Sequence, residues 1–261
     1  MDLASFGLAK VEVFLLVLAR TAGIFTLVPI FGAKQTPVQV RICVALGLAL
    51  VFLPLCSPGV AGPLAVDLLP MALLLIREAI VGIVIGFVTL MVFAAIQAAG
   101  DLVDVHSGFS IATVFDPVSG SATAVAGLFN YMVAGMLFFA TNTHHIVLSG
   151  LADSFRLFPI GRMGLNPAVV GGVVDLVAVF FVIALRIAAP VVAAVFLAEV
   201  ALAIIARVVP QMNVFMVGMP LKLGIGLAGM AIALPVTVAL MRNAFGDIAR
   251  QTAWLLRILA S

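Results

Sequence analysis

Long runs of apolar residues, separated by short breaks of polar residues, proline and glycine, make up most of the chain. Residues 79–100, 117–152 and 223–241 contain no Asp, Glu, Lys or Arg. A helix needs about 20 apolar residues to cross a hydrocarbon core of about 30 Å. Each of these runs is long enough to do so. The pattern therefore predicts an all-α, polytopic membrane protein.

The breaks between these runs predict about six long, kinked helical units. We expect them at about 8–31, 40–55, 64–105, 122–152, 168–209 and 214–257. The third unit would be about 63 Å long as one straight helix, which is more than a bilayer crossing needs. Arg77 and Glu78 divide it, and Pro190 and Pro235 are candidate kink sites in the last two units. Such helices must kink or project beyond the hydrocarbon.

Composition supports a membrane location and excludes other classes of protein. Hydrophobic residues make up 65% of the chain and charged residues only 9%, whereas a soluble domain carries about 25% charged residues. The net charge of +2 comes without a cluster of Lys and Arg, which excludes nucleic acid as a partner. Cys43 and Cys56 are too few for a disulfide framework or a metal site. We expect both to be small buried side chains.

The distribution of Lys and Arg favours a cytoplasmic location for both termini. In a six-span arrangement, the richer side holds Lys10, Arg77, Arg156, Arg162, Arg242, Arg250 and Arg257. The poorer side holds Lys34, Arg41, Arg207 and Lys222. The positive-inside rule places the richer side in the cytoplasm. Asp2, Lys10 and Glu12 precede the first apolar run without a small-residue cleavage site, so we expect an uncleaved first helix.

Ionisable residues interrupt the apolar runs at Arg20, Asp175, Arg186 and Glu199. Such a residue inside a membrane segment is a candidate functional group. It can also form an ion pair between helices or face a water-filled lumen. A proton-coupled transporter would place acids in several spans, and here Glu199 is the best candidate and Asp175 the next.

The sequence contains no recognisable nucleophile–base pair, nucleotide motif or set of metal ligands. We therefore expect neither an enzyme nor a bound cofactor or metal ion. Residues 224–229 match G-x-G-x-x-G but lie inside an apolar run, where small residues let helices approach closely. Gly82 and Gly86 are interpreted in the same way. His144 and His145 follow Asn142 without an acidic or Cys partner nearby, which indicates a helix end or an interface.

The stretch from Ser107 to Thr123 combines turn residues with large apolar residues. Its turn signals include Asp116, Pro117 and Gly120. Its large apolar residues are Phe109, Ile111, Val114 and Phe115. A solvent-exposed loop would avoid the two phenylalanines, whereas a constriction or plug in a pore would use them. Ordinary packing is the alternative interpretation.

A second polar stretch, residues 207–222, lies between the last two apolar runs. It holds Arg207, Pro210, Gln211, Asn213, Phe215, Gly218, Pro220 and Lys222, together with Met212, Met216 and Met219. Backbone groups that proline frees at this depth must be satisfied by protein or water. We interpret Arg20, Glu199, Arg207 and Lys222 as polar contacts between helices or between subunits. The methionines suit either core filling or a deformable contact surface.

Three stretches carry a family resemblance. The first is Leu18–Gly23 with Pro29 and Gln35–Arg41, and the second is Phe109–Pro117 with Ser119 and Gly120. The third and most specific is Pro210–Phe215 with Gly218, Pro220, Leu221 and Lys222. They resemble the FliR family, a component of flagellar-type protein export that is shared with type III secretion injectisomes. The resemblance extends over nearly the whole chain.

This resemblance implies a single-copy subunit of an export gate in the bacterial inner membrane, within the flagellar basal body. It implies FliP-like and FliQ-like partner subunits in a shallow helical assembly, an FlhB-like subunit, and unfolded proteins in transit. Within one membrane domain, 1–261, about 1–165 looks like FliP and about 166–261 looks like FliQ. By the same resemblance, the stretch 107–123 is the plug that closes the central pore.

We therefore expect an export-gate subunit of the flagellar type III secretion apparatus. It would help to form and close the inner-membrane conduit for unfolded flagellar proteins and would have no catalytic role. One alternative is an ion-coupled small-solute transporter that depends on Glu199. The other is a purely structural membrane anchor.

Overall fold

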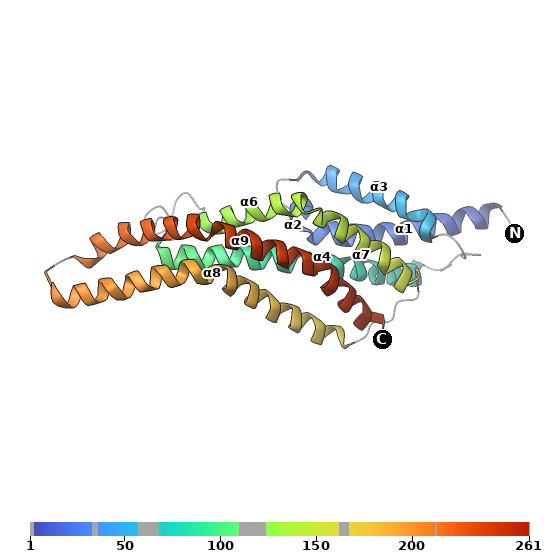
Figure 1. Cartoon of the computed structure of the whole chain (residues 1–261). Coiled ribbons are helices and arrows are strands. Elements are labelled where there is room, and N and C mark those ends of the chain that lie inside the picture. The colour runs from blue at the N-terminus through green and yellow to red at the C-terminus, as the bar shows by residue number, and fades with distance from the viewer. Residues whose placement is uncertain are drawn as a thin grey trace. The chain divides into compact units, whose positions relative to one another are not determined.

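A computed structural model describes residues 3–32, 36–56, 68–109, 124–161, 167–211 and 213–260. All regular secondary structure in these ranges is helical (Figure 1), which confirms the all-α class. The helices are α1 (Leu3–Leu27), α2 (Pro29–Gly32), α3 (Val38–Cys56), α4 (Leu68–Ser107), α6 (Val125–Ala140), α7 (Thr143–Leu157), α8 (Val169–Val208) and α9 (Val214–Ala260).

Four of these helices are long and apolar enough to cross a membrane. They are α3, α4, α8 and the Met216–Leu259 part of α9, and the bent pair α6 and α7 would add a fifth span. Pro190 lies within α8, and Pro220 and Pro235 lie within α9. The polytopic architecture is therefore confirmed, although the six predicted units do not map one-to-one onto spans.

The fourth predicted unit, 122–152, is two helices and not one. α6 ends at Ala140, and α7 begins at Thr143. Between them Asn142 has a φ of 55°, in the left-handed region, which a continuing right-handed helix cannot adopt. His144 and His145 therefore lie in the first turn of α7, with ring centroids 4.2 Å apart. The interpretation of this segment as a helix end is confirmed.

The helices form two compact units, which we call unit 1 and unit 2. Unit 1 comprises Met1–Met91, Asn142–Val177 and Asp247–Ser261, and unit 2 comprises Val92–Thr141 and Ala178–Gly246. The boundaries fall inside α4, α8 and α9. Each unit draws on residues from both the FliP-like and the FliQ-like halves, and the division into these halves stays a prediction.

Three glycines allow α1 and α4 to pack closely in unit 1. A Cβ added at Gly23 would lie 2.6 Å from the carbonyl oxygen of Ala79, and one at Gly86 would lie 2.8 Å from that of Ile24. At Gly82 it would overlap the carbonyl oxygen of Arg20. Any larger residue at these positions would push the two backbones apart. The predicted close packing at Gly82 and Gly86 is therefore confirmed. α1 also packs beside α3 (Figure 1).

Three buried phenylalanines form the centre of unit 2. The ring centroids of Phe93 and Phe138 are 5.5 Å apart, those of Phe93 and Phe245 are 5.3 Å apart, and those of Phe138 and Phe245 are 6.0 Å apart. These residues come from α4, α6 and α9. Tilted and edge-on aromatic pairs of this kind contribute about 0.5–1.5 kcal/mol each beyond the burial of their area. The cluster therefore ties the three helices together within this unit.

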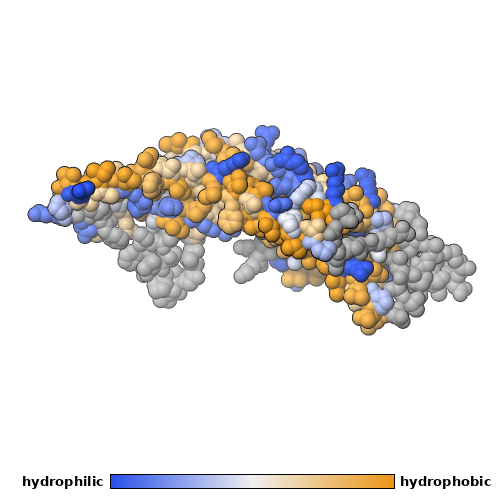
Figure 2. All heavy atoms as spheres, turned by 90° about the horizontal axis from the view of Figure 1, so that it is seen from below, coloured by the Kyte–Doolittle hydropathy of each residue, from blue (hydrophilic) through white to orange (hydrophobic). Residues whose placement is uncertain are grey.

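The surface carries far more large apolar side chains than a soluble protein exposes. Met136, Val208 and Ile232 are 75%, 75% and 80% exposed, and hydrophobic residues cover much of the face drawn in Figure 2. Large exposed apolar surfaces mark contact with lipid or with protein partners. Cys43 is also exposed and Cys56 is half-buried. The expectation of two buried cysteines was wrong, because an apolar neighbourhood in the sequence also describes a lipid-facing helix surface.

Candidate functional site

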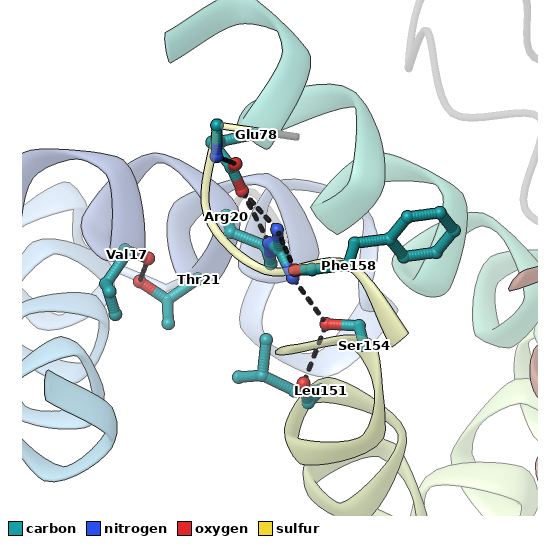
Figure 3. Close-up of polar contacts among 8 residues, drawn as sticks. Val17, Arg20, Thr21, Glu78, Leu151, Ser154 and Phe158 are labelled. Carbon is teal, nitrogen blue, oxygen red and sulfur yellow. Dashed lines mark hydrogen bonds and ion pairs between the residues drawn. The ribbon is translucent and has the colours of Figure 1, made fainter. Parts of the chain in front are cut away.

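A buried ion pair joins α1 to α4 in unit 1 (Figure 3). The Nε of Arg20 donates a hydrogen bond of 2.6 Å to Oε2 of Glu78, and Nη2 lies 2.5 Å from the same oxygen. The two side chains are 0% and 1% exposed. Both charges are therefore fully removed from solvent, and each depends on the other for compensation.

The remaining polar groups of this pair bind α7 and the segment after it. Nη1 of Arg20 donates to the Ser154 hydroxyl at 3.2 Å, and Nη2 donates to the carbonyl of Phe158 at 3.2 Å. The guanidinium carbon also lies 4.4 Å from the ring centroid of Phe155, within cation–π range. The backbone N–H of Gly161 donates to Oε1 of Glu78 at 3.1 Å. We call Arg20, Glu78, Ser154, Phe158 and Gly161 the Arg20 network.

The Arg20 network is suited to fixing geometry and not to exchanging protons or ligands. Each nitrogen of its guanidinium and each oxygen of its carboxylate has a partner within the chain, and both side chains are closed to water. The sequence indicated Arg20 as a polar contact between helices, whereas Glu78 stood out only as a divider of a long apolar unit. Ser154 was not singled out. The sequence could have indicated Glu78 as the partner of Arg20, because a buried arginine needs an acidic partner and few acidic residues interrupt the apolar runs.

Glu199 on α8 and Lys222 on α9 form a second ion pair, within unit 2. Their side chains are 34% and 28% exposed, so this pair, unlike Arg20 and Glu78, is only partly enclosed by the chain itself. Close packing of the same helices is provided by Gly218, where a Cβ would lie 3.3 Å from Cδ1 of Leu202. The sequence analysis interpreted Glu199 and Lys222 as polar contacts between helices or between subunits. The structure shows that they contact each other across the turn between α8 and α9.

The other residues of the 207–222 stretch lie in or near this turn. Arg207, Pro210, Gln211 and Pro220 are exposed. The Oδ1 of Asn213 accepts a hydrogen bond of 3.3 Å from the N–H of Met216, as an N-cap residue does at the start of a helix. Arg207 lies in the last turn of α8, where a cation complements the helix dipole. Met212 and the side chain of Phe215 lie outside the described residues.

The predicted plug stretch is described only at its first residues. Gly108, with a φ of 82°, ends α4, and Phe109 follows it half-buried. A Cβ at Gly226 of α9 would overlap the Ser107 hydroxyl and would lie 3.6 Å from Phe109, so this glycine supports close packing, as predicted. Ile111, Val114, Phe115, Asp116, Pro117 and Gly120 lie outside the described residues.

Sequence reasoning missed Asp104, which caps the helix that follows this stretch. Oδ1 of Asp104 accepts from the N–H of Ala126 at 2.9 Å, and Oδ2 accepts from that of Gly127 at 3.0 Å. The N-cap residue itself is Ala124, which has no side chain that could cap. Asp104 is 1% exposed. The Asp104 carboxylate of α4 therefore lies at the N-terminus of α6, within unit 2, where the helix dipole is positive.

Two glycines make this capping possible. A Cβ at Gly100 would lie 2.5 Å from the carbonyl oxygen of Ala126, and a Cβ at Gly127 would overlap Oδ1 of Asp101. The two backbones thus approach closely enough for the short side chain of Asp104 to reach the first N–H groups of α6. The sequence offered one signal, an Asp three residues before the end of a long apolar helix, and that signal does not specify a partner.

Comparison with known proteins shows similarity along nearly the whole chain. The model of the family described as Bacterial export proteins, family 1, matches residues 11–248. The flagellar biosynthetic protein FliR of Bacillus subtilis (strain 168) is 35% identical over 236 residues, which cover 89% of this chain and 90% of that protein. The flagellar biosynthetic protein FliR of Escherichia coli (strain K12) is 28% identical, with 88% and 87% covered. The Yop proteins translocation protein T of Yersinia pestis is 32% identical, with 80% of each chain covered.

Removing one charge of the buried pair should strongly destabilise the protein. Glu78→Gln keeps the shape of the side chain but leaves the Arg20 guanidinium buried without its counter-charge. We expect a loss of about 3–5 kcal/mol of folding free energy, measured as a lower Tm of the purified full chain in detergent. Arg20→Met combined with Glu78→Leu should recover a substantial part of this loss, because no lone charge is then buried.

The matched control is Arg250→Gln, which breaks the Arg250–Asp247 pair. That pair has an N–O distance of 2.8 Å, but its side chains are 78% and 44% exposed, so we expect a change of no more than about 1 kcal/mol. Equal Tm values for Glu78→Gln and Arg250→Gln would contradict the assigned importance of burial.

Replacing Asp104 should loosen the start of α6. Asp104→Ala leaves the N–H groups of Ala126 and Gly127 buried without acceptors, at a cost of about 1–3 kcal/mol. We expect faster hydrogen–deuterium exchange in peptides covering the start of α6, with Asp104→Asn intermediate because one acceptor oxygen is kept. Asp175→Ala, at an exposed position of α8, is the control. Unchanged exchange in Asp104→Ala would show that the two hydrogen bonds do not hold this helix end.

Proposed function

The chain belongs to family 1 of the bacterial export proteins, the family of the FliR proteins, and on this premise we propose that it works as one subunit among several. Its role is in the type III export gate of the flagellar apparatus. The proposed partners are FliP-like and FliQ-like subunits, an FlhB-like subunit and unfolded proteins in transit. The proposed site is the bacterial inner membrane. The observation that carries this proposal is the family match over residues 11–248.

The lengths of the helices support protein partners in addition to lipid. α4 and α8 contain 40 residues each and α9 contains 47, which corresponds to about 60 Å and about 70 Å of helix. A hydrocarbon core is only about 30 Å thick. Large parts of these helices therefore extend beyond the lipid while still carrying exposed apolar residues such as Val208 and Ile232. Neighbouring subunits would cover such residues.

We propose further that the stretch 107–123 closes the conduit between substrates. A passage wide enough for an unfolded chain would leak ions, and apolar side chains can seal around a polypeptide without specific recognition. The described flanks support this assignment. Gly226 packs on Ser107 and Phe109 at the start of the stretch, and Asp104 holds the helix that begins at its end. The proposal assigns the chain no catalytic step.

Purification of the tagged chain from its own membranes in mild detergent, with intact-complex mass measurement, tests the proposed assembly. We expect one copy of this chain together with several FliP-like and FliQ-like subunits. A stable monomer or homodimer without such partners would contradict the proposal. That result would favour a transporter, and solute binding by Glu199→Gln would then be the next measurement.

Lys222→Ala should reduce assembly of the gate more than it reduces membrane insertion. Since the Lys222–Glu199 pair is only partly buried, we expect about a two- to fivefold loss of assembled complex, with unchanged chain in the membrane fraction. Exchanging the charges, as Glu199→Lys with Lys222→Glu, should restore assembly, because the pair joins two helices of the same chain.

The control for this prediction is Arg207→Ala, which removes an exposed cation from the same stretch. Equal recovery of complex from Lys222→Ala and the unmodified chain would refute the role of the pair. Failure of the charge exchange to restore assembly would show that Lys222 acts on a partner subunit and not on Glu199.

A further inference from the structure

A groove of about 310 Å³ runs between α7 and the C-terminal part of α9, within unit 1. Its apolar lining includes Ile146 and Leu157 of α7 and Leu256 of α9. The helices touch where a Cβ at Gly150 would lie 3.2 Å from Cγ2 of Thr252. The groove thus lies between two neighbouring helices and has both apolar and polar lining residues, and none of the polar contacts described above uses it.

Two arginines line this groove, one from each helix. Arg156 lies in the last turn of α7 and Arg257 in the last turn of α9. Arg257 is exposed and forms no ion pair with any residue in the described ranges. Arg156 contacts Asp153 at 3.4 Å, but their side chains are 71% and 59% exposed, so this pair is weak and easily exchanged. The lining therefore has a net positive charge.

A basic residue in the last turn of a helix also complements the helix dipole. That explanation accounts for each arginine taken singly. It does not account for the groove that the two arginines share, nor for the lack of an acidic partner for Arg257 in the described part of the chain.

Arg257 lies near the C-terminal end of a helix that is long and apolar enough to cross a membrane. The candidate span Met216–Leu259 ends two residues after Arg257. Trp254, the single tryptophan of the chain, lies one turn earlier and is 39% exposed. Tryptophan and arginine gather where a membrane span meets water, because each has an apolar body and a polar end. The charge distribution of the sequence also favours the cytoplasmic side for Arg156 and Arg257.

We propose that this groove binds an acidic phospholipid. The phosphate sits at the guanidinium groups of Arg156 and Arg257, and an acyl chain lies along the apolar lining. Guanidinium groups recognise phosphate with paired hydrogen bonds and a full charge. Basic pockets between membrane helices are suited to acidic headgroups for the same reason. A zwitterionic lipid offers the same apolar chains but no net negative charge, so it should bind more weakly.

Lipid retention by the purified complex tests this inference. The tagged full chain, with whatever subunits accompany it, is exchanged into nanodiscs of phosphatidylcholine alone or with phosphatidylglycerol. Retained lipid is then measured by native mass spectrometry. We expect phosphatidylglycerol to be retained at least about fivefold over phosphatidylcholine. Arg257→Gln and Arg156→Gln should each weaken this preference, and the double variant should abolish it.

Arg242→Gln is the matched control, because Arg242 is an exposed arginine of the same helix that does not line the groove. It should keep the preference of the unmodified chain. Arg257→Lys, which retains the charge, should keep part of it. This variant keeps the test decisive if the double variant folds poorly.

Three results would overturn the proposal. The first is equal retention of the two lipids by the unmodified complex. The second is an equal rise in Tm from inorganic phosphate and from phosphatidylglycerol, which would indicate a site for free anions. The third is loss of a partner subunit from the double variant with lipid preference unchanged, which would show that protein covers the groove.

Discussion

The ion pair between Arg20 and Glu78 is the constraint on which the arrangement of unit 1 depends. A guanidinium that is 0% exposed is tolerated only if its charge and its donors are matched. Glu78 supplies the charge from α4, while Ser154 and the Phe158 carbonyl supply acceptors from α7 and the segment after it. Any shift of α1, α4 or α7 would leave one of these groups unsatisfied. The glycines at 23, 82 and 86 let α1 and α4 approach closely at this level.

Unit 2 satisfies the same requirement with different residues. The first turn of α6 would present unpaired N–H groups to an apolar interior. Asp104 accepts hydrogen bonds from two of them. Gly100 and Gly127 permit the short distance, and Phe93, Phe138 and Phe245 fill the space between α4, α6 and α9. In both units, the buried charged side chains are held by groups from another helix.

These features suit a subunit whose outer surfaces contact lipid and neighbouring subunits. The charged side chains of Arg20 and Glu78 are enclosed in contacts within the chain. The outside, by contrast, is apolar over stretches of α6, α8 and α9. An export-gate subunit needs this combination. Its own helices must keep a fixed arrangement, while its surface accommodates lipid and neighbouring subunits.

The sequence by itself determined the class of protein, the long membrane helices, the close-packing glycines and the family. These follow from local properties, namely the length of apolar runs, small-residue spacing and short motifs. It also indicated that Arg20 requires a polar contact. The tertiary structure alone decided that this contact is with Glu78, 58 positions away, and with Ser154, 134 positions away. It decided likewise that Asp104 caps α6 and that Cys43 faces outward. Such facts depend on which helices meet and in what register, and periodicity along one helix carries no information about the partner that packs against it.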